Sequence, residues 1–379
     1  MTSLTIGPTA ATRAASRTAA PAGTTTTDLT GLRAVARRLV GLGRGILVAD
    51  EPLRVMNARF QLTGVEPTGR NRRDYRELLV TSPGLSRAVS GVVLSDETIR
   101  QRTRDGDRFP SRLADAGLLA GVSVDTRRVP LPGAGGETVT EGLDGLRDRL
   151  AEYRQLGATF AKWRAVFPVD DLRPSPRAVQ ANAHVLARYA AACQDQGLVP
   201  IVGPEVLMDG DHSQVRDGLV TGQVLREVFR HLLIAGVDLA AVVLEPNMVL
   251  PGVGHPRPAR PDDVAASTIA VLRSAVPAAV PGVAFLSGGQ SPRQATANLA
   301  AMRFLSAPWS LTFCFGRALS EPALLAWAGD PRAWQAGQRA LLHRVECNRR
   351  AMGGEVPFGR SPIGASRIDP SPIDGESTA

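Results

Sequence analysis

One lysine stands out among the residues of this chain that could do chemistry. Of the 44 lysine and arginine residues, only Lys162, in the string FAKWR, is a lysine. A lysine amine can condense with a carbonyl group or donate a proton to its oxygen, whereas arginine cannot supply a neutral amine at pH 7. Carboxylates gathered around such an amine could act as acid and base, because like charges shift one another's pKa values. These residue types predict chemistry next to a carbonyl group.

The elements that must position these side chains can be recognised from their hydrophobic pattern. Eight short apolar, β-prone runs alternate with segments of helical spacing. Continuous apolar runs of this length are typical of parallel strands buried on both faces. The alternation predicts an α/β fold, a single (β/α)8 TIM barrel without a second domain. The runs are residues 45–50, 91–97, 121–125, 160–164, 199–205, 240–246, 282–289 and 311–317.

Polar residues stand where these predicted strands end. The active site of such a barrel lies at the carboxyl ends of its strands, here called the mouth. We therefore expect one site built from Asp50, Asp96 with Glu97, Ser123 with Asp125, Lys162 with Arg164, Glu205, Glu245, Ser287-Gly288-Gly289 and Gly316-Arg317.

The last two strand ends predict a phosphate site. Ser287, Gly288 and Gly289 offer a hydroxyl and backbone N–H groups, and Gly316 and Arg317 add an N–H group and a guanidinium. Barrels commonly bind phosphate after strands seven and eight, where backbone donors and a helix N-terminus converge. The guanidinium fork matches phosphate oxygens.

The two ends of the chain differ in composition from its middle. Residues 1–28 are rich in Ala, Thr, Ser and Arg and hold no acid before Asp28. They predict a disordered leader, although the composition also fits an organellar transit peptide. Residues 351–379 predict a mobile tail rich in Pro, Gly and Ser. The barrel is left with residues 29–350.

Composition also excludes several classes of protein. The net charge is +8, but the arginines are spread evenly among acids, as a coding bias from lysine to arginine would leave them. This distribution argues against a nucleic-acid partner or a membrane surface. Three widely spaced cysteines suit a reducing compartment, and no apolar run reaches the length of a membrane span. We expect a cytoplasmic protein.

Several long strings resemble the class I fructose-1,6-bisphosphate aldolases, in family order over about residues 29–350. They are GRGILVADE, NRRDYRELL, VPLPGAGGETVTEGLDGL, GATFAKWRAV, NAHVLARYA, PEVLMDGDH, EPNMV, GVAFLSGGQS and FGRAL. The resemblance implies a (β/α)8 barrel, a homo-oligomer (tetramer or dimer) and a small phosphorylated substrate. Members of this family cleave fructose 1,6-bisphosphate into dihydroxyacetone phosphate and glyceraldehyde 3-phosphate through an imine on a lysine, without a metal or another cofactor.

The resemblance also assigns residues. Its active-site positions correspond to Asp50, Lys162, Arg164 and Glu205, and its site for the phosphate on the ketone half corresponds to Ser287, Gly288, Gly289, Gly316 and Arg317. We expect catalytic roles for Asp50, Lys162, Glu205 and Glu245, and substrate binding by Arg164 and the five phosphate-site residues.

Other positions depart from the family pattern. The imine-forming lysine, which precedes PNM, is replaced by Glu245, and the first glutamate of the pair on strand five is Gly203. Residues that serve the second phosphate are replaced by Pro52, Val55 and Ser123. A carboxylate cannot form an imine. The losses make the mouth about two charges more acidic, which disfavours a doubly phosphorylated substrate.

These departures predict an altered enzyme. We expect carboxylate acid–base chemistry, of a lyase or an isomerase, on a carbonyl compound or sugar with one phosphate, and not the imine-based cleavage of fructose bisphosphate. Two alternatives stay open: an imine moved to Lys162, as in the transaldolases, or a non-catalytic homologue that binds a phosphorylated metabolite or a partner protein. The mouth carboxylates could hold Mg²⁺ or Mn²⁺, but no histidine belongs to the mouth, and we expect no metal.

Overall fold

The computed structural model describes residues 1, 28–41 and 43–353. The predicted leader, residues 1–28, and the predicted tail, residues 351–379, lie almost wholly outside these residues. Within the described part of the chain, no helix is both long and apolar enough to cross a membrane.

Eight parallel strands close into a barrel, as the sequence predicts. Their order around the barrel is β1-β10-β9-β8-β7-β6-β3-β2. The strands are β1 (Gly45–Ala49), β2 (Val89–Leu94), β3 (Leu119–Ser123), β6 (Phe160–Phe167), β7 (Val199–Val206), β8 (Val243–Leu244), β9 (Gly282–Phe285) and β10 (Ser310–Phe315). The fold is a (β/α)8 TIM barrel.

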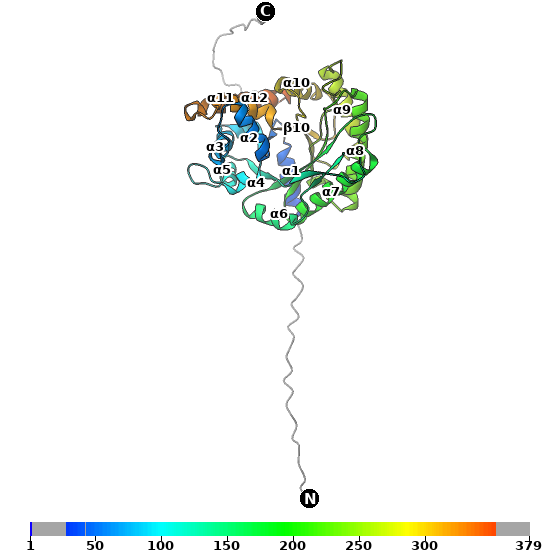
Figure 1. Ribbon diagram of the computed structural model, residues 1–379, viewed down its shortest axis with the longest axis horizontal. Coiled ribbons are helices and arrows are strands. Elements are labelled where there is room, and N and C mark those ends of the chain that lie inside the picture. The colour runs from blue at the N-terminus through cyan, green and yellow to red at the C-terminus, as the bar shows by residue number, and fades with distance from the viewer. Residues whose placement is uncertain (2–27, 42, 354–379) are drawn as a thin grey trace, which may run out of the picture.

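Helices surround the barrel (Figure 1). Several begin at a serine whose hydroxyl accepts a hydrogen bond from a backbone N–H group of the first turn, as Ser175 does for α7 and Ser291 for α10. The helices are α1 (Leu29–Leu39), α2 (Leu53–Leu62), α3 (Gly69–Val80), α4 (Asp96–Arg100), α5 (Phe109–Asp115), α6 (Leu146–Gln155), α7 (Pro176–Asp195), α8 (Gln214–Ile234), α9 (Pro261–Ala275), α10 (Pro292–Met302), α11 (Arg317–Trp327) and α12 (Trp334–Ala351).

Two strand ends differ from the prediction. The run 240–246 forms a strand only at Val243–Leu244, because Leu239–Ala241 is a 3₁₀ turn. The run 91–97 leaves the sheet after Leu94, and the Ser95 hydroxyl caps the short helix α4. Apolar residues alone do not distinguish a strand from an adjoining turn.

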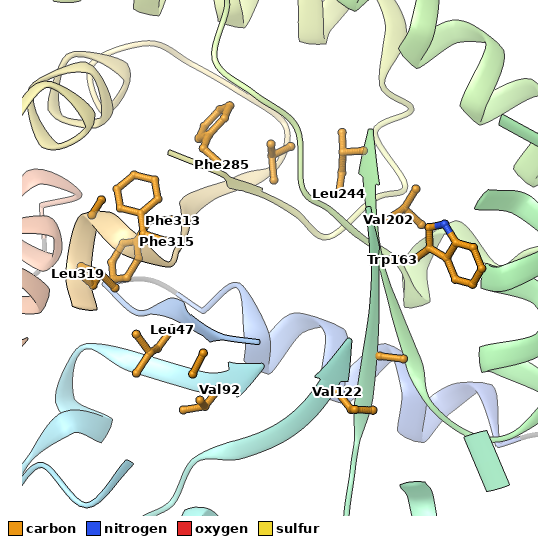
Figure 2. Close-up of a cluster of buried hydrophobic side chains, with 14 of the residues drawn as sticks. Leu47, Val92, Val122, Trp163, Val202, Leu244, Phe285, Phe313, Phe315 and Leu319 are labelled. Carbon is orange, nitrogen blue, oxygen red and sulfur yellow. The ribbon is translucent and has the colours of Figure 1, made fainter. Parts of the chain in front are cut away.

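The alternation of side chains along β6 places the lysine. Neighbouring residues of a strand point to opposite faces. Phe160 packs inside the barrel, while Ala161 and Trp163 pack outward against the helices. Figure 2 shows Trp163 in this outer core layer, with side chains of the other strands such as Leu47 and Phe285. Lys162 therefore points into the barrel, on the face of Phe160.

Helix α1 closes the other end of the barrel. Leu32, Ala36 and Leu39 of this helix pack in one cluster with interior residues such as Ile46 and Phe160. These side chains are buried. A ligand can therefore reach Lys162 only from the mouth.

A two-stranded hairpin, which was not predicted from the sequence, follows β3. It consists of β4 (Arg127–Pro130) and β5 (Thr138–Glu141), which pair antiparallel. The buried Asn182 side chain of α7 accepts a hydrogen bond from Thr140 N (3.2 Å) and donates one to Thr138 O (2.9 Å). These bonds attach the hairpin to the barrel.

Gly121 tests the packing of the barrel interior. A Cβ atom at this residue of β3 would lie 2.1 Å from Phe160 Cε2. Because Phe160 is fully buried, it cannot move aside freely. We expect Gly121→Ala to lower the free energy of unfolding by about 1–3 kcal/mol, measured by urea denaturation. Gly218→Ala is the control, since its Cβ would meet its nearest neighbours at 3.4 Å and 3.5 Å, and equal losses in both variants would contradict this account.

Candidate active site

A cavity of about 770 Å³ opens at the carboxyl ends of the barrel strands. Its size is that of a small-molecule site. All ten predicted site residues line it: Asp50, Lys162, Arg164, Glu205, Glu245, Ser287, Gly288, Gly289, Gly316 and Arg317. The structure therefore brings together every residue that the sequence assigned to the mouth, while their individual roles remain predictions.

Lys162 lies between two carboxylates at the bottom of this cavity. Its Nζ atom is 3.3 Å from Asp50 Oδ2 and 3.5 Å from Glu245 Oε1. Only 8% of the lysine side chain is exposed. Burial by itself lowers the pKa of Lys162, but the charges of Asp50 and Glu245 raise it further, so the net shift is upward. The resting form of Lys162 is an ammonium ion.

Glu245 is the most deeply buried acid of the site. Burial raises its pKa to about 7, although the Lys162 charge opposes this shift. Its Oε2 atom has no hydrogen-bond partner among the described residues. A Cβ atom on Gly203 would lie 2.9 Å from that oxygen. The glycine therefore leaves the space that the Glu245 carboxylate occupies, and the two departures from the family pattern are spatially coupled.

A third acid faces the same lysine. The Ser123 hydroxyl donates a hydrogen bond to Asp125 Oδ1 (3.1 Å). Burial raises the pKa of Asp125, and the Lys162 charge partly offsets this increase. Asp125 was recognised as a strand end in the sequence but was not assigned a role.

Arg164 and Glu205 form an ion pair across β6 and β7, between Nε and Oε2. Burial lowers the pKa of Arg164, but the carboxylates of Glu205, Glu245 and Asp125 together raise it, so the net shift is upward. Arg164 is therefore already paired with a protein carboxylate, which favours a positioning role over that of an unpaired phosphate ligand.

The part of the cavity wall that follows β9 and β10 offers backbone N–H groups as hydrogen-bond donors. Gly288 and Gly289 have φ angles of +55° and +87°, a conformation that favours glycine. Helix α11 begins at Arg317 directly after Gly316, with no side chain capping its first N–H groups. Free N–H groups at a helix N-terminus and an arginine suit an anion such as phosphate.

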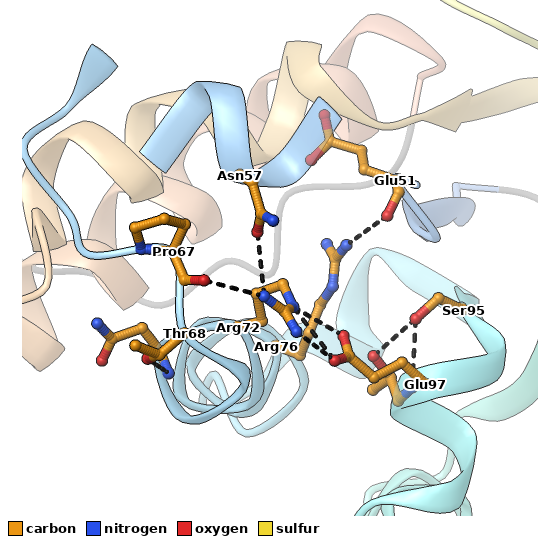
Figure 3. Close-up of polar contacts among 10 residues, drawn as sticks. Glu51, Asn57, Pro67, Thr68, Arg72, Arg76, Ser95 and Glu97 are labelled. Atoms are coloured by element: carbon orange, nitrogen blue, oxygen red, sulfur yellow. Dashed lines mark hydrogen bonds and ion pairs between the residues drawn. The ribbon is translucent and has the colours of Figure 1, made fainter. Parts of the chain in front are cut away.

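Arginines behind the cavity neutralise the acids of its rim. Arg72 contacts Glu97 at 2.6 Å, and Arg59 contacts Glu51 at 2.5 Å. Figure 3 shows how Arg72 reaches from α3 to Glu97, while Arg76 donates a hydrogen bond to the Glu51 carbonyl oxygen (3.4 Å). Neither ion pair includes a position that departs from the family pattern.

Two further arginines, to which the sequence gave no role, reach the cavity. Arg127 and Arg128 of the hairpin line it. The signal was present in the strings RRVP and TVTE, which flank a Gly-rich turn in the manner of a hairpin.

The described residues contain no group of three or more His, Cys, Asp or Glu side chains arranged to hold a metal ion. His212 lies in the loop between β7 and α8, as expected, and does not line the cavity. Its Nε2 atom is 3.8 Å from Asp217 Oδ1.

The comparisons with known proteins agree with this geometry. A family profile described as "Fructose-bisphosphate aldolase class-I" matches residues 31–365. The chain belongs to the class I fructose-bisphosphate aldolase family. It is thereby a member of a family of lyases.

Relatives cover nearly all of the barrel. "Probable fructose-bisphosphate aldolase class 1" of Xylella fastidiosa (strain 9a5c) is 47% identical over 330 residues, which are 87% of this chain and 98% of the relative. "Fructose-bisphosphate aldolase B" of Gallus gallus is 44% identical over 88% of this chain and 93% of its own length. A crystal structure of fructose-bisphosphate aldolase from Plasmodium falciparum, in complex with TRAP and a small-molecule inhibitor, has a TM-score of 0.86 at 40% identity. It covers 90% of this chain and 99% of that one.

These relatives contradict the functional prediction made from the sequence. We expected a lyase or an isomerase that acts by carboxylate chemistry on a compound with one phosphate, and not the imine-based cleavage of fructose bisphosphate. The alternatives were an imine moved to Lys162 and a non-catalytic homologue. Proteins 44–47% identical over most of the chain are named fructose-bisphosphate aldolases, so that prediction is wrong. It gave the departures at single positions more weight than the resemblance of the whole barrel.

Asp217 makes the stability of the loops beside the mouth dependent on pH. Its Oδ2 atom accepts a hydrogen bond from Leu250 N (3.1 Å), and burial raises its pKa to about 8. Between about pH 4 and pH 8 the folded state therefore retains a proton that the unfolded chain has lost. The contribution of Asp217 to stability falls by about 1.4 kcal/mol for each pH unit in this range.

Replacing Asp217 with an uncharged isostere should remove this slope. We expect the free energy of unfolding of Asp217→Asn, relative to that of the wild type, to increase as the pH rises from 5 to 8. Urea denaturation at several pH values measures it, with the exposed Asp263→Asn as control. A difference that stays constant with pH would show that Asp217 is ionised in the folded state.

Proposed function

We propose that the protein is a fructose-bisphosphate aldolase, a lyase that cleaves fructose 1,6-bisphosphate between C3 and C4. The observation that carries this proposal is the 44–47% identity to proteins named for that activity, over 87–88% of the chain. The mouth supports it, because it combines one amine, several acids and the residues of the predicted phosphate site in a single cavity.

We assign the amine to Lys162, since it is the only lysine of the chain. Asp50 is its nearest base, at 3.3 Å, and accepts a proton from the ammonium ion. The neutral amine attacks the C2 carbonyl of the open-chain sugar, and Asp50 returns the proton to the leaving hydroxyl, which departs as water. The product is a protonated imine, whose positive charge attracts electrons from the neighbouring C3–C4 bond. This arrangement differs from the family pattern, in which the amine stands at the position of Glu245.

Glu245 is placed to carry the second proton. As a carboxylate it accepts the proton of the C4 hydroxyl, the C3–C4 bond breaks, and its electrons neutralise the imine to an enamine. Glu245 then returns the proton to C3, and water releases the ketone from Lys162. A group with a pKa of about 7 can accept and return a proton near neutral pH.

The remaining site residues hold the substrate. Ser287, Gly288, Gly289, Gly316 and Arg317 bind the phosphate on C1, and the Glu205 carboxylate holds Arg164 at the rim. We further propose that residues 29–350 form the catalytic unit, with residues 1–28 and 351–379 as tails. The protein would act as a homo-oligomer in the cytoplasm, where the free thiols of Cys193, Cys314 and Cys347 stay reduced.

Lys162 gives the direct test of this function. Cleavage is measured by a coupled assay for triose phosphate with fructose 1,6-bisphosphate, and an adduct is sought by borohydride reduction and peptide mass spectrometry. We expect a reduced adduct on Lys162, and a loss of kcat of about 10³-fold or more in Lys162→Arg, which keeps the charge but lacks a neutral amine.

The possible outcomes separate the function from the assignment of the amine. Cleavage by the wild type without an adduct would contradict the role of Lys162 and leave the lyase in place. A wild-type protein that does not cleave fructose 1,6-bisphosphate would contradict the proposed function itself.

The raised pKa of Glu245 predicts how the rate of the reaction depends on pH. The carboxylate form is needed to accept the C4 hydroxyl proton, and it accumulates as the pH rises through about 7. We expect kcat to rise over this range in the wild type. Glu245→Gln should lose the rise and lower kcat by about 10²–10⁴-fold. Asp96→Asn at the rim is the control, and a rise that survives in Glu245→Gln would assign the proton transfer to another residue.

A further inference from the structure

The basic side chains that line the cavity fall into two groups. Lys162, Arg164 and Arg127 each form an ion pair with a carboxylate of the protein. Arg128 and Arg317 make no side-chain hydrogen bond or ion pair with any described residue. An unpaired guanidinium at a cavity wall has its full set of donors available to a ligand. The cavity thus has two unpaired cations.

These two cations lie on different sides of the mouth. Arg317 stands after β10, next to the glycines that follow β9, and Arg128 stands in the hairpin that follows β3. In the closed order of eight strands, β3 is four places from β9 in either direction. The hairpin and the Gly288-Gly289 turn therefore leave the barrel from diametrically opposite strands.

The hairpin holds Arg128 toward the barrel. Arg128 pairs with Thr140 and Arg127 with Glu141, so that each pair shares one face of the ribbon. Thr140 is 3% exposed, and Asn182 of α7 binds its backbone. Arg127 is on the other face and is engaged by Glu141 at 2.9 Å. Both arginines line the cavity, but only Arg127 is paired with a carboxylate of the protein, so the two differ in availability.

Nearby acids do not compete strongly for Arg128. Glu97 on the same side of the mouth is bound by Arg72, and Glu141 is bound by Arg127. Burial raises the pKa of Asp125, which reduces its tendency to carry a charge. An anionic ligand is the natural partner of this guanidinium, and its planar fork matches phosphate oxygens.

We propose that Arg128 binds a second phosphate, across the cavity from the phosphate held at Gly288, Gly289 and Arg317. It makes the protein selective for sugars with a phosphate at each end. The identity of the ligand as a ketose bisphosphate rests on the proposed function, but the pair of anion subsites does not. Arg128 is then a specificity-determining residue that compensates for the departures at Pro52, Val55 and Ser123.

The test measures binding without catalysis. Two ligands that cannot be cleaved, mannitol 1,6-bisphosphate and mannitol 1-phosphate, are titrated calorimetrically into the full-length wild type, Arg128→Ala and Arg188→Ala. We expect the wild type to bind the bisphosphate at least 10-fold more tightly than the monophosphate. Arg128→Ala should weaken bisphosphate binding by about 10- to 100-fold and leave monophosphate binding unchanged, as the loss of a charged hydrogen-bonding pair predicts.

Arg188→Ala, an exposed arginine of α7 that does not line the cavity, is the control, and it should bind both ligands as the wild type does. Equal affinity of the wild type for the two ligands would overturn the inference, as would an Arg128→Ala variant that binds the bisphosphate normally or loses both ligands equally. Unchanged circular dichroism and thermal unfolding verify that the exposed substitution leaves the fold intact. A protein that binds the bisphosphate through Arg128 but does not cleave fructose 1,6-bisphosphate would retain the subsite and contradict only the proposed function.

Discussion

The site depends on one buried lysine held between two carboxylates. Lys162 Nζ lies within 3.5 Å of both Asp50 and Glu245, and these three side chains come from or follow β6, β1 and β8. Removing one member of such a buried group leaves an unpaired charge, at a cost of about 3–5 kcal/mol. Only a closed barrel can bring these three strand ends to one point. The charge arrangement around Lys162 thus depends on closure of the sheet, and the packing of α1 against the barrel interior leaves the mouth as its access to a ligand.

One glycine gives a carboxylate neighbour of Lys162 its space, and two arginines offset the charge of other acids at the mouth. Gly203 leaves room for the Glu245 carboxylate, and burial raises the pKa of Glu245 to about 7 although the Lys162 charge opposes this shift. Arg59 and Arg72 neutralise acids of the rim from behind. Acids outnumber bases along the cavity wall, but Glu51 and Glu97 are paired with arginines that lie outside it. Charge complementarity depends on ion pairs as much as on residue counts.

The barrel and the location of its mouth could be predicted from the sequence, but the ion pairs around the mouth could not. The barrel could be predicted because eight apolar runs alternate with helices, and the site because a barrel gathers its strand ends at one mouth. The ion pair of Glu97 with Arg72 could not be predicted, because these residues are 25 positions apart and meet only through the packing of α3. The same limitation concealed the availability of Arg128. The prediction of a different reaction failed because single departures such as Glu245 were given more weight than the resemblance of the whole barrel to the family.

The most direct test of the account is exchange of the carbonyl oxygen of dihydroxyacetone phosphate with ¹⁸O-labelled water, followed by mass spectrometry. An imine at C2 replaces that oxygen each time it forms and hydrolyses. We expect the wild type to accelerate the exchange well above the rate in buffer, and Lys162→Arg to lose the acceleration. Exchange at the buffer rate in the wild type would contradict the assignment of the reactive amine to Lys162.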